Sequence, residues 1–207
     1  RPGLISGFRL ILGLALLLGA LAGCGGPRPV ESPPDTASVE PAAPRGTPDQ
    51  MLLKEALQRR DLAPTEAAAL SDRLLGNGNA VLQDQETMAR LVLLLLKAVN
   101  KHGDKESRPV LLRNLGIIYY HQKKYKDARQ QLQNSIELNP RNARTHFYLA
   151  KLFIHEGLIY EGQGKKKVAK QQFKRAAIEM DQARKLEPRN TLYHQDIKQI
   201  VQQEVGK

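Results

Sequence analysis

The side chains in this sequence that could carry chemistry are one cysteine and five histidines. A single cysteine, Cys24, excludes an intrachain disulfide and any zinc or iron–sulfur site built from four thiolates. The histidines do not share a helical face with carboxylates at the spacing of metal ligands. We therefore expect no metal, no cofactor and no catalytic residue, so that the chain is not an enzyme. The histidines are His102, His121, His146, His155 and His194.

The residues before Cys24 are organised like a secretory signal. Arg9 precedes an apolar run from Leu10 to Leu18, and small residues follow until Leu21-Ala22-Gly23-Cys24. A charged start, a short apolar centre and a small-residue exit are typical of a cleaved signal peptide. The alternative is an uncleaved transmembrane anchor, for which the apolar stretch falls short of the roughly 20 residues that a span needs.

The segment Leu21-Ala22-Gly23-Cys24 resembles the lipobox of bacterial lipoprotein precursors. The resemblance implies removal of residues 1–23 and attachment of a diacylglyceride to the sulfur of Cys24. Two or three acyl chains would hold the protein on a bilayer, because each buried CH₂ contributes about 0.8 kcal/mol. An acylated Cys24 is not available as a nucleophile. Since Gly25 is not the Asp that commonly retains lipoproteins at the inner membrane, the resemblance favours the periplasmic face of the outer membrane.

Residues 24–48 are predicted to be a disordered tether. Seven prolines stand between residues 25 and 48, with Gly, Ser, Thr and Ala among them and no apolar periodicity. A Pro-rich linker extends by about 3.1 Å per residue, which gives this one a maximal reach of roughly 75 Å. The tether would therefore hold a folded domain away from the membrane.

The positive charge of the chain lies mainly in its second half. The formal net charge is +11, and residues 97–207 hold 23 Lys and Arg against 11 Asp and Glu. This excess favours an acidic partner, which for an exported chain would be a protein, lipid headgroup or cell-wall polymer and not nucleic acid. The alternative is a solvated basic face on amphipathic helices.

Residues 49–106 are predicted to form three helices. These helices would either cap the helical repeats that follow them in the chain or act as one degenerate repeat. Asp49 would cap the first helix, and Pro64 opens a second that ends at the loop Gly76-Asn77-Gly78-Asn79. Asp84 would cap a third helix that runs to about Lys101. Its apolar run Leu91–Leu96 covers most of the helix circumference, so we expect it to be buried on several sides.

Residues 107–142 have the spacing of a helical repeat. A large–small pair, aromatic residues, an alanine and a closing proline follow one another as Leu115, Gly116, Tyr119, Tyr120, Tyr125, Ala128, Leu132, Ser135, Leu138 and Pro140. This pattern resembles the 34-residue tetratricopeptide repeat, which consists of two antiparallel helices. The resemblance implies that Gly116 on the first helix faces Ala128 on the second, where small residues let the backbones approach. Pro140 would end the second helix.

A second and longer repeat is predicted at 143–190. Pro140 and the closing Pro188 are 48 residues apart, 14 more than the repeat requires. Seven extra residues on each helix are close to two turns, which predicts a protruding hairpin with helices at about 143–162 and 165–187. The alternative is a first helix that ends at Gly157. The packing positions would be Leu149, Ala150, Phe153, Phe173, Ala176, Met180, Ala183 and Pro188.

Thr191–Val205 is predicted to be a single capping helix that completes residues 191–207. The predicted fold is therefore all-α. It is a short right-handed α-solenoid of TPR-type helical hairpins at 107–207 with capping helices, preceded by a signal peptide and a disordered linker. The apolar side of the last helix would carry Leu192, Ile197, Ile200 and Val201.

The resemblance places a partner-binding groove on the inner faces of the first helix of each repeat. The residues at these positions are basic and partly aromatic, which suits an acidic and apolar partner segment. The alternative is that Tyr120 and Phe147 serve packing alone. Lys165-Lys166-Lys167, at the predicted hairpin tip, could touch anionic lipid or cell-wall polymer, or be a solvated turn. The predicted groove residues are Arg113, Ile117, Tyr120, His121, Arg144, Phe147, Lys151 and His155.

The function predicted from the sequence is that of a lipid-anchored scaffold for protein–protein interaction in the cell envelope. On general architecture, the nearest analogy is to the pilotins of type IV pilus assembly. The alternative is a regulatory activator of enzymes that synthesise or hydrolyse peptidoglycan. The two hypotheses differ in the partner, a secretin or pilus component in the first and a cell-wall enzyme in the second.

Overall fold

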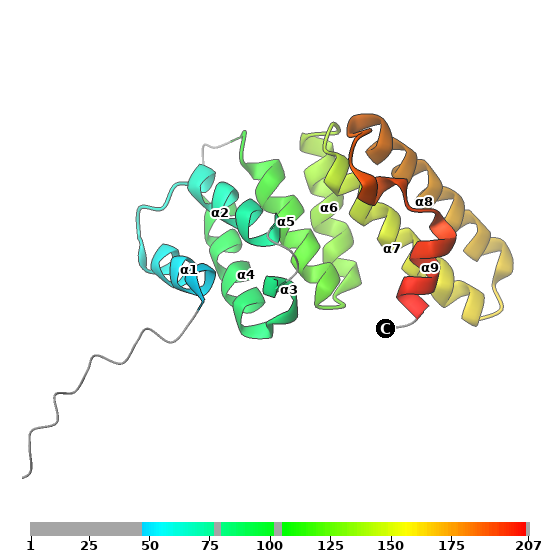
Figure 1. Ribbon diagram of the computed structural model, residues 1–207, viewed down its shortest axis with the longest axis horizontal. Coiled ribbons are helices and arrows are strands. Elements are labelled where there is room, and N and C mark those ends of the chain that lie inside the picture. The colour runs from blue at the N-terminus through cyan, green and yellow to red at the C-terminus, as the bar shows by residue number, and fades with distance from the viewer. Residues whose placement is uncertain (1–46, 77–79, 102–104, 206–207) are drawn as a thin grey trace, which may run out of the picture. The chain divides into compact units, whose positions relative to one another are not determined.

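The computed structural model describes residues 47–76, 80–101 and 105–205, and every regular element within them is helical (Figure 1). The predicted signal peptide, Cys24 and most of the predicted tether lie outside these residues. Within these ranges, no helix combines the length and the apolar composition of a membrane span. The predicted all-α fold of stacked helical hairpins is confirmed.

Four helices form the first part of the stack. They are α1 (Pro48–Gln58), α2 (Pro64–Gly76), the short α3 (Ala80–Gln83) and α4 (Gln85–Val99). Helices α2 and α4 pack against each other and against the next hairpin, and α1 packs on α4. Pro64 opens α2 as predicted, whereas α3 was not predicted.

The caps of α1 and α4 show how local sequence sets these helix starts. Asp84 caps α4 as predicted, because its carboxylate accepts hydrogen bonds from the backbone N of Glu86 and Thr87. The prediction that Asp49 caps α1 is wrong. Thr47 is the cap, and it exchanges reciprocal hydrogen bonds of 3.3 and 3.1 Å with Gln50, as a capping box.

The apolar run of α4 is buried on one side only. Leu91, Leu94 and Leu95 are fully buried, but Leu93 is 60% exposed and Leu96 is also exposed. The prediction of burial on several sides is therefore wrong for two of the six residues. Helix α4 touches α1, α2, α3 and α5, and none of them covers Leu93.

The next hairpin is α5 (Arg108–His121) and α6 (Tyr125–Leu138). The predicted close approach at Gly116 is confirmed. A Cβ at Gly116 would lie 2.7 Å from Cγ of Leu132 and 3.2 Å from the backbone O of Ala128. Only a glycine lets α5 and α6 pack at this separation.

The long hairpin is α7 (Ala143–Gly162) and α8 (Lys166–Leu186), as the count of residues between Pro140 and Pro188 predicted. The alternative of a helix ending at Gly157 is wrong, because α7 continues through that residue. A Cβ at Gly157 would lie 2.5 Å from the ring of Phe173 on α8, so the glycine makes room for that ring. Gly164 in the turn has φ +74°, which favours glycine.

His146 joins α7 to α8 and to the turn before α7. Its Nδ1 lies 2.6 Å from a carboxylate oxygen of Glu179, and its Nε2 lies 2.9 Å from the carbonyl O of Pro140. Both partners are acceptors, so the doubly protonated ring satisfies both. Burial lowers the pKa of His146, but the hydrogen bonds to Glu179 and Pro140 and the charge of Glu179 outweigh it, and the pKa is raised.

The final segment is a 3₁₀-helix, η1 (Thr191–His194), followed by α9 (Ile197–Val205). The prediction of one continuous helix is therefore wrong. Gln195 is extended, and Asp196 starts α9 by accepting from the backbone N of Lys198. As a result Leu192 is 54% exposed, and Tyr193 is buried in its place.

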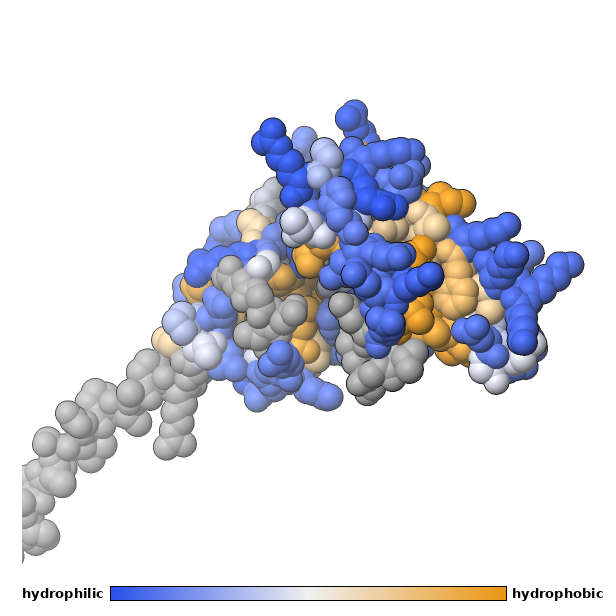
Figure 2. Space-filling model, turned by 45° about the vertical axis from the view of Figure 1, so that its right-hand side comes forward, coloured by the Kyte–Doolittle hydropathy of each residue, from blue (hydrophilic) through white to orange (hydrophobic). Residues whose placement is uncertain are grey.

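Most of the predicted packing residues lie in the core. Helix α5 contacts α2, α4, α6 and α7, and α7 contacts α5, α6, α8 and α9. Polar side chains cover much of the face drawn in Figure 2, and apolar surface emerges between them. Tyr119, Tyr125, Phe153 and Phe173 are partly buried, whereas Leu138, Pro140 and Pro188 are exposed. The buried members are Leu115, Gly116, Tyr120, Ala128, Leu132, Ser135, Leu149, Ala150, Ala176, Met180 and Ala183.

Candidate functional site

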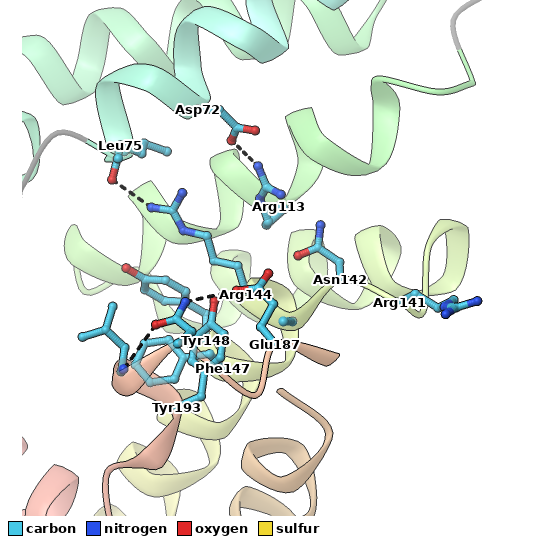
Figure 3. Close-up of a pocket in the computed structure, with 14 residues that line it drawn as sticks. Asp72, Leu75, Arg113, Arg141, Asn142, Arg144, Phe147, Tyr148, Glu187 and Tyr193 are labelled. Carbon is cyan, nitrogen blue, oxygen red and sulfur yellow. Dashed lines mark hydrogen bonds and ion pairs between the residues drawn. The ribbon is translucent and has the colours of Figure 1, made fainter. Parts of the chain in front are cut away.

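A cavity of about 550 Å³ lies between α2, α5, α7 and η1 (Figure 3). It is formed by residues that are far apart in the sequence, from the end of α2 to the 3₁₀-helix. Three arginines and two carboxylates line it together with aromatic rings. The lining residues that carry charge or a ring are Asp72, Arg113, Arg141, Arg144, Phe147, Tyr148, Glu187 and Tyr193.

Arg113 lies on one wall of the cavity and is held by a buried polar network. Its guanidinium pairs with Asp72 of α2, and its Nε donates a 3.0 Å hydrogen bond to Oδ1 of Asn114. The amide of Asn114 in turn donates to Ser71, at 2.7 Å, and to Asp72, at 2.8 Å. Since Arg113 and Asn114 are buried, this network fixes α5 against α2 and orients Asp72.

Arg144 crosses the cavity from α7 to α2. Its guanidinium donates a 2.9 Å hydrogen bond to the backbone O of Leu75. Figure 3 shows this side chain in the centre of the view, above the rings of Phe147, Tyr148 and Tyr193. Arg144 is only partly buried, so further donors of its planar group can meet a carboxylate.

Aromatic rings form the apolar part of the cavity. The ring centroids of Phe147 and Tyr193 are 5.2 Å apart, and those of Phe147 and Tyr148 are 5.5 Å apart. Burial and the negative charge of Glu187 raise the pKa of Tyr193 to about 12. Burial also raises the pKa of Tyr148. Both tyrosines are therefore neutral at physiological pH and serve as packing groups with a polar end.

The aromatic contacts continue from the cavity along α5 and α7. Tyr148 packs edge-on against Tyr120, with centroids 5.6 Å apart, and its hydroxyl lies 3.3 Å from Nε2 of His121. Lys151 places its Nζ 4.9 Å from the ring centroid of Tyr120. Farther along α7, His155 stacks on Tyr125 with ring centroids 3.7 Å apart. These rings pack mainly against one another.

The structure divides the eight predicted groove residues into three groups. Arg113, Arg144 and Phe147 line the cavity. His121, Lys151 and His155 are partly buried beside the aromatic contacts, outside the cavity lining. The last two, Ile117 and Tyr120, are buried in the core, so they offer no surface to a partner. For Tyr120 this agrees with the alternative that its role is packing.

Several lining residues were not predicted from the sequence. Tyr193 was assigned to a continuous helix with Leu192 on its buried side. Because the helix is broken before α9, Tyr193 is buried and Leu192 is exposed. Asp72 and Leu75 come from α2, which carries no signal of contact with α7. Tyr148 had one local signal in the sequence, which is that it directly follows the predicted groove residue Phe147.

The polar groups of the cavity are suited to binding. Guanidinium groups, carboxylates and phenol hydroxyls line it together, from Arg113, Arg141, Arg144, Asp72, Glu187, Tyr148 and Tyr193. In residues 47–76, 80–101 and 105–205 no three His, Cys, Asp or Glu side chains gather as metal ligands do. Arginines over aromatic rings suit a carboxylate next to an apolar side chain.

Part of the chain matches a known protein family. The family described as "Tetratricopeptide repeat" matches residues 107–177, which cover α5, α6, α7 and the first half of α8. No curated protein matches the chain. Tetratricopeptide repeats are protein-interaction modules, typically without catalytic activity, so this segment has the build of an interaction scaffold.

Proposed function

We propose that this protein is a lipid-anchored scaffold that holds a partner protein of the cell envelope in the cavity between α2, α5, α7 and η1. The observation that carries the proposal is that the Arg144 guanidinium and the rings of Phe147 and Tyr193 line one open cavity. The match to the tetratricopeptide repeat supports protein binding in general.

The partner segment that fits this cavity has an acidic side chain beside an apolar or aromatic one. Three arginines against two carboxylates leave the lining with an excess of positive charge. Arg113 is already paired with Asp72, so Arg144 and the exposed Arg141 are the cations that meet a partner. An apolar side chain of the partner would pack on Phe147.

The membrane anchor is part of the proposal and rests on the sequence around Cys24. Acylation of Cys24 would place the folded unit at the end of a Pro-rich tether, on the periplasmic face of the outer membrane. A scaffold on such a tether could present its cavity to a pilus or secretin component, as in the pilotin analogy. The second candidate partner is an enzyme of peptidoglycan metabolism.

Site-directed photo-crosslinking in native cells tests the proposal. Leu192 lines the cavity and is 54% exposed, so a benzoylphenylalanine at this position reports on an occupant. The matched control is the same group at Ile178, which is 60% exposed on α8 and is not part of the cavity lining. We expect a discrete protein adduct from position 192 that is lost when Arg144→Ala and Phe147→Ala are added.

The identity of the crosslinked protein separates the two partner classes. A secretin or pilus component supports the assembly role, and a peptidoglycan synthase or hydrolase supports the regulatory role. Equal adducts from positions 192 and 178, or an adduct indifferent to Arg144→Ala and Phe147→Ala, would contradict the proposed site.

A further inference from the structure

The α7–α8 hairpin extends beyond the α5–α6 hairpin by about two helical turns. Tyr125 stacks on His155, and Arg129 pairs with Glu156, so the start of α6 lies beside residues 155 and 156 of α7. From there α7 continues to Gly162. At 1.5 Å per residue the hairpin end lies about 10 Å farther out. The turn is therefore well placed to reach a surface that the α5–α6 turn does not.

This end of the hairpin is strongly basic. Between Glu161, which is exposed in the last turn of α7, and Glu179, the chain contains six Lys and Arg and no Asp or Glu. All six are exposed, three of them consecutively at the turn and the start of α8. The α5–α6 turn adds exposed lysines to the same end of the stack. The hairpin cations are Lys165, Lys166, Lys167, Lys170, Lys174 and Arg175, and those near the neighbouring turn are Lys123, Lys124 and Lys126.

Apolar side chains accompany the cations at the same end. Ile159, in the last turn of α7, is 46% exposed. Its neighbour Tyr160 is partly buried, and Nζ of Lys165 lies 5.8 Å from the ring centroid of Tyr160. This combination matches the layers of a membrane interface. The aliphatic side chain and the ring suit the apolar boundary, and the lysines, with their long apolar stems, suit the headgroups. A soluble polyanion would engage the lysines and leave Ile159 without a role.

We infer that the α7–α8 turn, through Lys165, Lys166, Lys167 and Ile159, docks on a lipid bilayer that carries anionic headgroups. Each lysine near such a surface strengthens binding roughly fivefold, so the three together contribute about a hundredfold. The contact goes beyond the proposed scaffold role and does not depend on acylation of Cys24. It would fix the orientation of the folded unit at the membrane.

The test is a fluorescence measurement on the full chain with Cys24→Ala, so that no lipid is attached and a new cysteine is unique. A nitrobenzoxadiazole dye is placed at Gln163→Cys in the turn, and in a separate control protein at Gln133→Cys, which is exposed on α6. Vesicles of phosphatidylcholine with phosphatidylglycerol are titrated against each protein. We expect a blue shift with rising intensity from position 163 and none from position 133.

Charge variants show whether the lysines cause the response. With Lys165→Gln, Lys166→Gln and Lys167→Gln together, the lipid concentration at half-maximal shift should rise about a hundredfold. The matched control replaces three exposed lysines elsewhere, Lys54, Lys105 and Lys185, by Gln and so has the same net charge. It should leave the titration nearly unchanged. Circular dichroism confirms that both triple variants retain their helix content.

Three results would overturn the inference. The first is an equal dye response from positions 163 and 133, and the second is an equal response to vesicles of phosphatidylcholine alone. The third is the same blue shift with soluble polyphosphate, which would assign the basic turn to an anionic polymer instead of a lipid surface. Because the dye reports locally, membrane binding by other parts of the chain does not produce the expected pattern.

Discussion

Arg144 on α7 donates a 2.9 Å hydrogen bond to the backbone O of Leu75, a residue 69 positions earlier in α2. This contact joins two helices that are separated in sequence by α3, α4 and the whole α5–α6 hairpin. It also holds the guanidinium over the rings of the cavity (Figure 3). The candidate site is thus a product of the stacking of the hairpins, since neither helix contains it alone.

Replacement of Arg144 should weaken binding without unfolding the protein. The side chain is partly exposed, and its loss leaves the carbonyl of Leu75 near solvent, so Arg144→Met should cost no more than about 1 kcal/mol of unfolding free energy. Urea denaturation followed by circular dichroism measures this. A loss of several kcal/mol would mean that Arg144 is mainly a structural residue.

Gly116→Ala should destabilise the α5–α6 hairpin. The added methyl would lie 2.7 Å from Cγ of Leu132, which is fully buried and cannot move aside easily. Overpacking of this kind costs about 1–3 kcal/mol. Gly162→Ala is the matched control, because a Cβ there has no atom within 4 Å. Equal stability of the two variants in urea would refute the close contact.

Gly157→Ala should be destabilising in a way that a second change relieves. Its Cβ would lie 2.5 Å from the ring of Phe173, so α7 and α8 would be forced apart. Phe173→Leu removes the ring and should recover part of the loss in the double variant. A double-mutant cycle in urea should give a coupling of about 0.5–3 kcal/mol. Additive effects would show that the two residues do not meet.

His146 should make stability depend on pH. Its pKa is raised in the folded protein, so its contribution is fully present below the unfolded value of about 6.5 and is lost as the pH rises through the folded pKa. We therefore expect the unfolding free energy of the wild type, relative to Glu179→Gln, to fall between mildly acidic and alkaline pH. The variant keeps an acceptor near Nδ1 but lacks the charge. Parallel pH curves for the two proteins would contradict this role of the ion pair.

The sequence predicted the helices and hairpin lengths well because these depend on local signals. Gly116, Ala128 and the distance from Pro140 to Pro188 define the two repeats, and the structure has the same helices. Pro64 and Asp84 likewise mark helix starts whose geometry is set by the nearest residues.

The errors occurred where a distant element decides the outcome. Leu93 is exposed because no helix covers that side of α4, and no local pattern reveals which side will be covered. Ile117 was assigned to an open groove, but contacts of α5 with its neighbours bury it. Tyr193 reaches the cavity only because the chain breaks before α9. Part of the candidate site could therefore be predicted, and the rest required the stacking.

Whether the partner occupies the cavity is decided by measuring the affinity of the crosslinked partner for the full chain. The partner is titrated calorimetrically into the wild type, into Arg144→Met with Phe147→Ala, and into a control with Lys174→Met and Ile178→Ala on the exposed side of α8. Loss of a charge-assisted contact and a packed ring should weaken binding about a hundredfold in the first variant and leave the control near the wild type. Unchanged affinity in the variant with Arg144→Met and Phe147→Ala would contradict the claim that this cavity binds the partner.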